Sequence, residues 1–272
     1  MSQETNVVEL EELVEIDLDN HLFDVIVIGA GAAGVGVSIA IQHAGVENYL
    51  VVDRASVGSS FASWPEETRF ITPSFPSNSV GMLDLNSIAV GVSPAFSMRV
   101  EHPTGKEFAD HLQNLADYFE LPLLENTDVL EIKKVDDVFH LETEKHTLTA
   151  KNIVWAAGEY QYPSQGGFPG SEFCVHTSSV AKYGDLEGDD FLIIGGYESG
   201  IDAAYHLARN DKKVKVFDLN APWAEASSDP SIALSTYSFE RILDNKFESN
   251  VELFAQTPVN SVTFDGDTYE IK

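Results

Sequence analysis

The stretch FDVIVIGAGAAG, residues 23–34, decides the fold of this 272-residue chain. An apolar strand, Phe23–Ile28, leads into three glycines spaced Gly-x-Gly-x-x-Gly, and a helical pattern follows to about Gly45. In such a loop the first glycine permits a tight turn, the second lets a pyrophosphate approach, and the third lets the helix pack closely on the strand. The free N–H groups and the dipole at the helix start favour an anion. The sequence therefore predicts a dinucleotide site formed by Gly29, Ala30, Gly31, Ala32, Ala33 and Gly34.

An acid at the end of the next strand completes this pattern. The apolar run Tyr49–Val52 ends on Asp53, 24 residues after Gly29. An acid at this place accepts a hydrogen bond from the adenosine ribose. The pattern is more specific than the glycines alone, and we predict that Asp53 contacts the nucleotide.

The same order of elements returns 166 residues later, with one difference. The strand Asp190–Ile194, a glycine-rich turn, a helix to about Ala208 and the strand Val214–Phe217 end on Asp218. Tyr197 replaces the middle glycine. An acid at the ribose suits the free 2′-hydroxyl of NADH, whereas a 2′-phosphate favours an arginine, so NADH is preferred over NADPH. The expected second site consists of Gly195, Gly196, Tyr197, Glu198, Ser199, Gly200 and Asp218.

These repeats predict an α/β protein with two Rossmann-like three-layer units. Short apolar strands flanked by helices are typical of parallel sheets that are covered on both faces. An amphipathic helix is expected over Gly105–Phe119. We expect an acidic arm at 1–22, a first dinucleotide-binding unit at 23–163 and a second one at 164–272. The remaining elements are expected to be a small antiparallel meander over 129–135, 138–143 and 147–150, a separate strand over 153–155, a helix near 237–247, and a hairpin over 251–272.

The charge of the chain limits its partners. Against 16 basic residues stand 44 acidic ones, which gives a net charge of −28. A field of this sign repels nucleic acids and anionic membranes, so neither is an expected partner. A homodimer is left open, and a small-molecule substrate is implied only by the family resemblance given below. An anionic dinucleotide must then be held mainly by backbone N–H groups.

Composition excludes several further classes of protein. Hydrophobic residues make up 43% of the chain, which is enough for a core, and the uncharged run 25–41 is better explained as strand, turn and helix than as a membrane span. The single Cys174 excludes a disulfide framework, a zinc knuckle and a redox CxxC pair, and it fits a cytoplasmic protein. Asp202 and His206 lie four residues apart and are expected to form a surface pair, so we expect no metal site.

Four segments resemble one family of flavoproteins. They are VGSSFASWP (57–65), RFITPSF (69–75), AAGEYQYP (156–163) and GGYESGIDAA (195–204), and together they resemble the bacterial flavin-containing monooxygenase-like group over roughly residues 22–272. The resemblance implies a flavin-dependent oxidoreductase in which NAD(P)H reduces FAD and the reduced flavin uses O₂ to oxygenate a small molecule. It implies that FAD contacts Asp53, Arg54, Phe61, Trp64, Val129, Ala157 and Gly158 besides the first glycine loop, and that Asn78 is a catalytic residue supporting the flavin.

The sequence departs from that family in ways that leave alternatives open. Ala157 replaces a common threonine, and the fingerprint Phe168-Pro169-Gly170 is followed by His176 two positions late. The family pattern continues for roughly a hundred residues beyond Lys272, so a fragment or a short form is expected. One alternative is a reductase of low-molecular-weight disulfides, although Ala33 takes the place of its hallmark cysteine. Another is a non-catalytic flavin- or nucleotide-sensing module.

Overall fold

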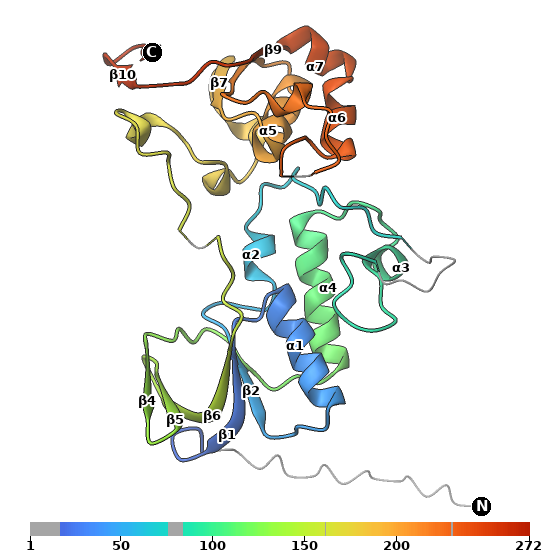
Figure 1. The fold of residues 1–272 in the computed structure, drawn as a ribbon, viewed down its shortest axis with the longest axis vertical. Helices are drawn as coiled ribbons and strands as arrows, with labels where there is room; N and C mark the ends of the chain where they lie inside the picture. Colours follow the sequence, from blue (N-terminus) through green and yellow to red (C-terminus); the bar gives the residue numbers. More distant parts are fainter. Residues whose placement is uncertain (1–16, 76–83, 161, 230) are drawn as a thin grey trace, which may run out of the picture.

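Residues 17–75, 84–160, 162–229 and 231–272 are described by the structure, which is a computed structural model. Two α/β units lie one above the other in Figure 1, and the yellow linker after β6 joins them at the left of the view. The first unit contains β1 (Leu22–Ile28), α1 (Ala32–His43), β2 (Tyr49–Val52), α2 (Ser59–Ala62), α3 (Pro94–Met98), α4 (Gly105–Tyr118), β3 (Leu123–Leu124), β4 (Glu131–Val135), β5 (Val138–Glu142) and β6 (Thr147–Trp155).

The first unit is built on one six-stranded sheet of mixed direction. Its strand order is β3-β2-β1-β6-β5-β4, in which β3, β2, β1 and β6 run parallel and β5 and β4 are antiparallel. The predicted parallel α/β sheet is therefore confirmed. The carboxyl ends of β1 and β6 meet beside the first glycine loop, the edge at which open parallel sheets bind ligands.

The expectation of two separate strands around residue 151 was wrong. The single strand β6 pairs antiparallel with β5 through its first half and parallel with β1 over most of its length. The polar residues Lys151 and Asn152, which lie between the two expected strands, both bond to Asp24 of β1: Lys151 Nζ to its carboxylate at 2.7 Å and Asn152 Nδ2 to its carbonyl at 3.0 Å. The meander is thus continuous with the parallel sheet.

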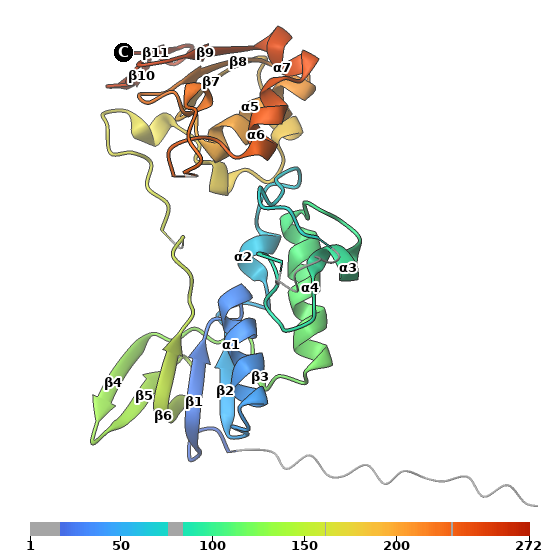
Figure 2. The same cartoon turned by 45° about the vertical axis from the view of Figure 1, so that its right-hand side comes forward.

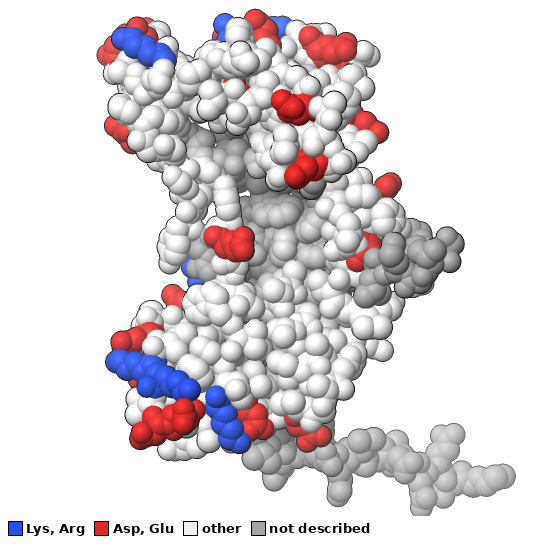
Figure 3. All heavy atoms as spheres, viewed as in Figure 1, with Lys and Arg blue, Asp and Glu red and all other residues white. Residues whose placement is uncertain are grey.

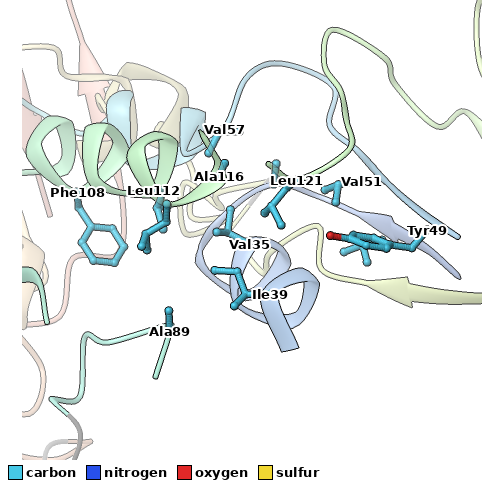
Figure 4. Close-up of a cluster of buried hydrophobic side chains, with 13 residues drawn as sticks. Val35, Ile39, Tyr49, Val51, Val57, Ala89, Phe108, Leu112, Ala116 and Leu121 are labelled. Carbon is cyan, nitrogen blue, oxygen red and sulfur yellow. The ribbon is translucent and has the colours of Figure 1, made fainter. Parts of the chain in front are cut away.

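Two hydrophobic clusters, one on each face of the sheet, hold the first unit together. Figure 4 shows Val35 and Ile39 of α1 packed near Leu112 and Ala116 of α4. The helix α4 follows the predicted amphipathic pattern and starts with a capping box between Thr104 and Glu107. The opposite cluster contains apolar side chains of β1 and β2 together with those of β5 and β6: Phe23, Ile26, Ile28, Leu50, Val52, Leu141, Leu148 and Ala150.

The second unit repeats the motif on a smaller sheet. All three strands of the order β7-β8-β9 run parallel, and α5 packs on them over the buried Ile201 and Leu207. Its elements are the short 3-10 helices η1 (Ser171–Phe173), η2 (Thr177–Ser179) and η3 (Tyr183–Asp185), then β7 (Asp190–Ile194), α5 (Glu198–Arg209), β8 (Lys213–Phe217), η4 (Pro222–Ala224), α6 (Thr236–Ile242), α7 (Asn245–Asn250), β9 (Val251–Phe254), β10 (Val262–Phe264) and β11 (Tyr269–Ile271).

Two expectations near the C-terminal end were wrong in detail. The single helix near 237–247 is two helices, because Asp244 accepts from the N–H groups of Lys246 and Phe247 and so starts α7. The first strand expected in the final hairpin is instead β9, which pairs parallel with β8; only β10 and β11 form a hairpin. Within the described ranges, no helix combines the length and the apolar character needed to cross a bilayer.

Candidate functional site

The first glycine loop contains three glycines, which differ in how closely other atoms of the chain approach them. Gly29 has φ +107°, and a Cβ there would lie 2.3 Å from the carbonyl oxygen of Ala156. A Cβ on Gly34 would lie 1.8 Å from the carbonyl oxygen of Gly29. Around a Cβ on Gly31, no heavy atom of the described residues lies within 4 Å. Gly29 and Gly34 are therefore required by the protein's own packing, whereas the space beside Gly31 is open, at the place where a pyrophosphate would approach the loop.

The start of α1 supplies the donors that such a ligand needs. Gly31 is the N-cap residue, and no side chain of the described residues caps it. The N–H groups of the first helical turn have no partner within the helix, and the helix dipole places partial positive charge there. The first turn, from Ala32 onward, also carries no acid. These features together fit the pyrophosphate of FAD without any lysine or arginine.

In both units, an aspartate accepts a hydrogen bond from the glycine turn. It is Asp53 after β2 in the first unit and Asp218 after β8 in the second. Asp53 Oδ2 accepts from the Ala30 N–H at 2.7 Å, and Oδ1 accepts from the Ala55 N–H at 2.8 Å. In the second unit, Asp218 Oδ2 accepts from the Gly196 N–H, also at 2.7 Å. Each carboxylate retains lone pairs for a ribose hydroxyl. Sequence reasoning missed this turn contact, although the repeated Gly-to-Asp spacing was its signal.

The second loop has the same close packing between its first and last glycines as the first loop. It differs at the two positions between them, where aromatic side chains lie. A Cβ on Gly200 would lie 1.9 Å from the carbonyl oxygen of Gly195, which repeats the first unit. At Gly196 a Cβ would lie 2.1 Å from the Trp223 ring, so this glycine is required by Trp223. Tyr197 stands at the position of Gly31, with 37% of its surface exposed.

Acidic side chains surround the second loop. Glu198, in the first turn of α5, accepts from the Ser235 N–H at 2.6 Å and from the Ser238 hydroxyl at 2.5 Å. The Tyr197 phenol has its pKa raised, first by partial burial and then by the negative charges of Glu198 and Asp229. Ser199 is exposed beside them. The second site therefore presents more negative charge than the first.

The segment after β2 lies against the first glycine loop. The Gly58 N–H donates to the Ala30 carbonyl at 3.0 Å, which docks α2 at the site. Phe61 and Trp64, predicted to contact FAD, belong to an aromatic cluster with Phe70 and Phe108, with ring centroids between 4.5 and 5.7 Å apart. The Phe61 and Trp64 rings therefore contribute to the packing of the first unit.

The other predicted FAD contacts are spread around the same edge of the sheet. Ala157 and Gly158 follow β6, and Ala157 lies against Gly29, where its Cα would be 3.1 Å from a Cβ. Arg54 is exposed and lines a cavity of about 160 Å³ next to residues 126–128. Val129 packs on the core cluster of the opposite sheet face. Asn78, the predicted catalytic residue, lies outside the described residues.

The expectation of a surface pair at Asp202 and His206 was wrong. Only 7% of Asp202 is exposed, and its carboxylate bonds to Arg241 and Thr68. His206 Nε2 lies 3.3 Å from Asp202 Oδ1, within ion-pair distance but outside hydrogen-bond geometry. The described residues contain no group of three or more His, Cys, Asp or Glu side chains suited to a metal ion. The arrangement is a buried ion pair.

A family model matches nearly the whole chain and so identifies its family. The family model described as pyridine nucleotide-disulphide oxidoreductase matches residues 26–272. The chain belongs to this family. Both glycine loops and both strand-end acids lie within the matched residues.

One curated relative is similar to this chain in sequence. The relative is an uncharacterized CzcO-like oxidoreductase of Geobacillus kaustophilus, 28% identical over 194 residues, which covers 70% of this chain and 53% of the relative. This chain spans about half the length of the curated relatives it matches.

Two similar solved structures differ in the reaction that their names imply. Bacillithiol disulfide reductase Bdr (YpdA) of Staphylococcus aureus matches with a TM-score of 0.70 and 19% identity, covering 92% of this chain and 71% of that one. A flavin monooxygenase of Stenotrophomonas maltophilia matches with a TM-score of 0.64 and 15% identity, covering 92% and 76%. At these identities the likeness shows the FAD/NAD(P) oxidoreductase fold, whereas both reaction types remain represented among the neighbours.

Proposed function

We propose that this chain binds the cofactors of an FAD-dependent oxidoreductase in which NADH reduces the flavin. The observation that carries the proposal is the first glycine loop, where the chain's own packing demands Gly29 and Gly34 but leaves the space at Gly31 open. That space faces the uncapped start of α1. A bound flavin supplies acceptance of a hydride and, once reduced, reactivity towards O₂ or a disulfide.

Charge around the second loop supports NADH over NADPH. Asp218 stands where a ribose 2′-hydroxyl would bind, and its neighbours Leu219 and Asn220 offer no basic side chain. Glu198 and Asp229 add negative charge near the loop. A 2′-phosphate carries about two further negative charges and would be repelled by these carboxylates. Asp218 therefore selects the nucleotide that lacks the phosphate.

The residues present favour oxygenation of a small molecule over disulfide reduction. Disulfide exchange proceeds through a thiolate, and the single cysteine is Cys174. Burial, and then the charge of Glu172, raises the pKa of the Cys174 thiol, so the thiolate is disfavoured. Ala33 stands at the place of the reductases' hallmark cysteine. The disulfide reductase is nevertheless the second candidate, because Bdr shares this fold.

The roles of this chain's own groups follow from their positions. Backbone N–H groups at the start of α1 would hold the pyrophosphate, and Asp53, which fixes the turn, would accept a hydrogen bond from the ribose. The second unit places its nucleotide through the corresponding backbone of α5. The aromatic cluster of Phe61, Trp64, Phe70 and Phe108 packs the segment that follows α2 against α4.

Anaerobic spectroscopy of the purified chain reconstituted with FAD tests the proposal. We expect bound flavin absorbance that is bleached by NADH under argon and faster by NADH than by NADPH. Air should then restore the flavin, with NADH oxidation that depends on O₂. A chain that takes up no FAD overturns the proposal, and binding of both nucleotides without bleaching indicates a sensing module. Bleached flavin reoxidised under argon by bacillithiol disulfide or cystine indicates the disulfide reductase.

A further inference from the structure

The segment that follows Trp64 connects the two units through polar contacts. Thr68 Oγ1 donates to Asp202 Oδ2 at 2.7 Å, although the two residues are 134 positions apart. The Glu66 N–H donates to the carbonyl of Ala181 at 2.9 Å. In Figure 1 the cyan chain after α2 rises from the lower unit to meet the upper one, and Figure 2 shows the same approach from a view turned by 45°.

Glu67, the residue before Thr68, makes further contacts with the second unit. Its two carboxylate oxygens accept from the N–H groups of Tyr183 at 3.2 Å and of Gly184 at 3.3 Å. These N–H groups begin the short helix η3 of the second unit. We call the contacts of Glu66, Glu67 and Thr68 with the second unit the junction.

The Asp202 carboxylate at the centre of the junction is buried and charged. Burial alone would raise the pKa of Asp202, but the contacts with His206 and the charge of Arg241 outweigh it and lower the pKa. A buried carboxylate is stable only while its oxygens are paired. Arg241 and His206 belong to the second unit, so Thr68 is the partner that the first unit contributes.

The space around the junction shows that polar contacts, not a continuous apolar core, join the units there. A cavity of about 850 Å³ lies beside it and is lined from both units by Arg69, Tyr237 and Arg241. The surface is also hollowed between the upper and lower parts of the face drawn in Figure 3. One stacked pair, His102 on Tyr237 at 4.0 Å between ring centroids, adds to the contact.

The two ends of the junction lie close in sequence to the two nucleotide sites. Thr68 is four residues after Trp64, on the segment that α2 docks against the first glycine loop. Asp202 is two residues after Gly200, within the first turns of the helix that the second loop opens. Hydride transfer requires reacting atoms about 3–3.5 Å apart, and a misplacement of 1 Å can cost on the order of 10²-fold in rate.

We propose that Thr68 and Asp202 are positioning residues that fix the second nucleotide loop relative to the flavin-side segment for hydride transfer. The inference rests on the proposed reduction of FAD by NADH. Thr68 touches neither cofactor in this scheme; it acts through Asp202 and α5. Loss of its hydroxyl therefore lowers the rate of flavin reduction, while each nucleotide still binds its own loop.

Thr68→Val removes the hydroxyl at nearly constant size and is the central variant. The FAD-reconstituted chain is mixed with NADH under argon in a stopped-flow instrument. We expect the limiting rate of flavin reduction to fall about tenfold or more, within the range that a sub-ångström to 1 Å shift allows. FAD occupancy and the NADH concentration that gives half the limiting rate should change less than about twofold. Thr68→Ser, which keeps the hydroxyl, should restore the rate.

Two further measurements make the outcome decisive. Thr263→Val, on the exposed hairpin strand β10, is the matched control and should behave as the wild type. Hydrogen exchange of the Tyr183 and Gly184 amides in the protein without cofactor should accelerate in Thr68→Val, because the junction opens. Unchanged exchange, a wild-type reduction rate, or a Thr68→Ser variant as slow as Thr68→Val overturns the inference. A wild-type chain that binds FAD and is not reduced by NADH overturns instead the proposed function.

Discussion

The substitution Gly31→Ala tests whether Gly31 is needed for folding or for binding of FAD. The added methyl group points into space where no heavy atom of the described chain lies within 4 Å, and the backbone, at φ −79° and ψ −168°, suits alanine. Replacing glycine at a compatible position stabilises by about 0.4–1 kcal/mol, whereas alanine is a poorer N-cap residue by a similar amount. The free energy of unfolding should therefore stay within about 1 kcal/mol of the wild type.

Binding of FAD should respond quite differently to the same methyl group. A Cβ at Gly31 stands where a pyrophosphate would approach the N–H groups at the start of α1. A hydrogen bond to a charged group contributes about 1.5–3 kcal/mol, so losing two weakens binding by about 3–6 kcal/mol, or roughly 10²–10⁴-fold in Kd. Gly34→Ala is the contrasting variant, because its Cβ would lie 1.8 Å from a backbone oxygen. Its overpacking should cost about 1–3 kcal/mol or more of folding stability.

Two measurements on each variant carry the comparison. Urea unfolding followed by circular dichroism gives the stability, and quenching of flavin fluorescence on titration with protein gives the affinity for FAD. We expect Gly31→Ala to fold normally and to lose FAD, and Gly34→Ala to lose both. A folded Gly31→Ala chain that binds FAD with wild-type affinity would refute the reasoning, because the open space would then not be the pyrophosphate site.

Three further predictions concern the core, the second loop and pH. Phe108→Ala should cost about 3–5 kcal/mol of unfolding free energy in urea, because the ring is 2% exposed, while Phe96→Ala, at 73% exposed, should stay within about 0.5 kcal/mol. Gly196→Ala should destabilise the second unit by about 1–3 kcal/mol, and Trp223→Ala in the same chain should remove most of that extra cost; additive losses in the double-mutant cycle would contradict the contact. Burial lowers the pKa of His111, so its contribution to stability is complete above its ordinary value of 6.5 and falls as pH drops below it. His111→Gln should therefore flatten the decline of the urea midpoint between about pH 6.5 and 5, and an unchanged slope would exclude His111 as its source.

Local patterns were sufficient to predict the two glycine loops and the helix α4. The Gly-x-Gly-x-x-Gly loop needs residues within six positions of one another, and an amphipathic helix shows its buried face in a 3.6-residue period. The same reasoning wrongly divided β6 into two strands, leaving the polar residues Lys151 and Asn152 between them. Their partner Asp24 lies 127 and 128 positions away, and only the pairing of β6 with β1 brings it near.

By itself, the sequence determined that this chain carries two glycine loops on parallel sheets, and both loops lie within the family match. The tertiary structure alone decided that Gly196 makes room for Trp223, that Asp202 is a buried ion-pair partner, and that Thr68 joins the two units at it. The physical reason is the range of the forces involved. Turns and helices are stabilised by hydrogen bonds between near neighbours, whereas burial and charge pairing depend on segments that meet only after the chain has folded.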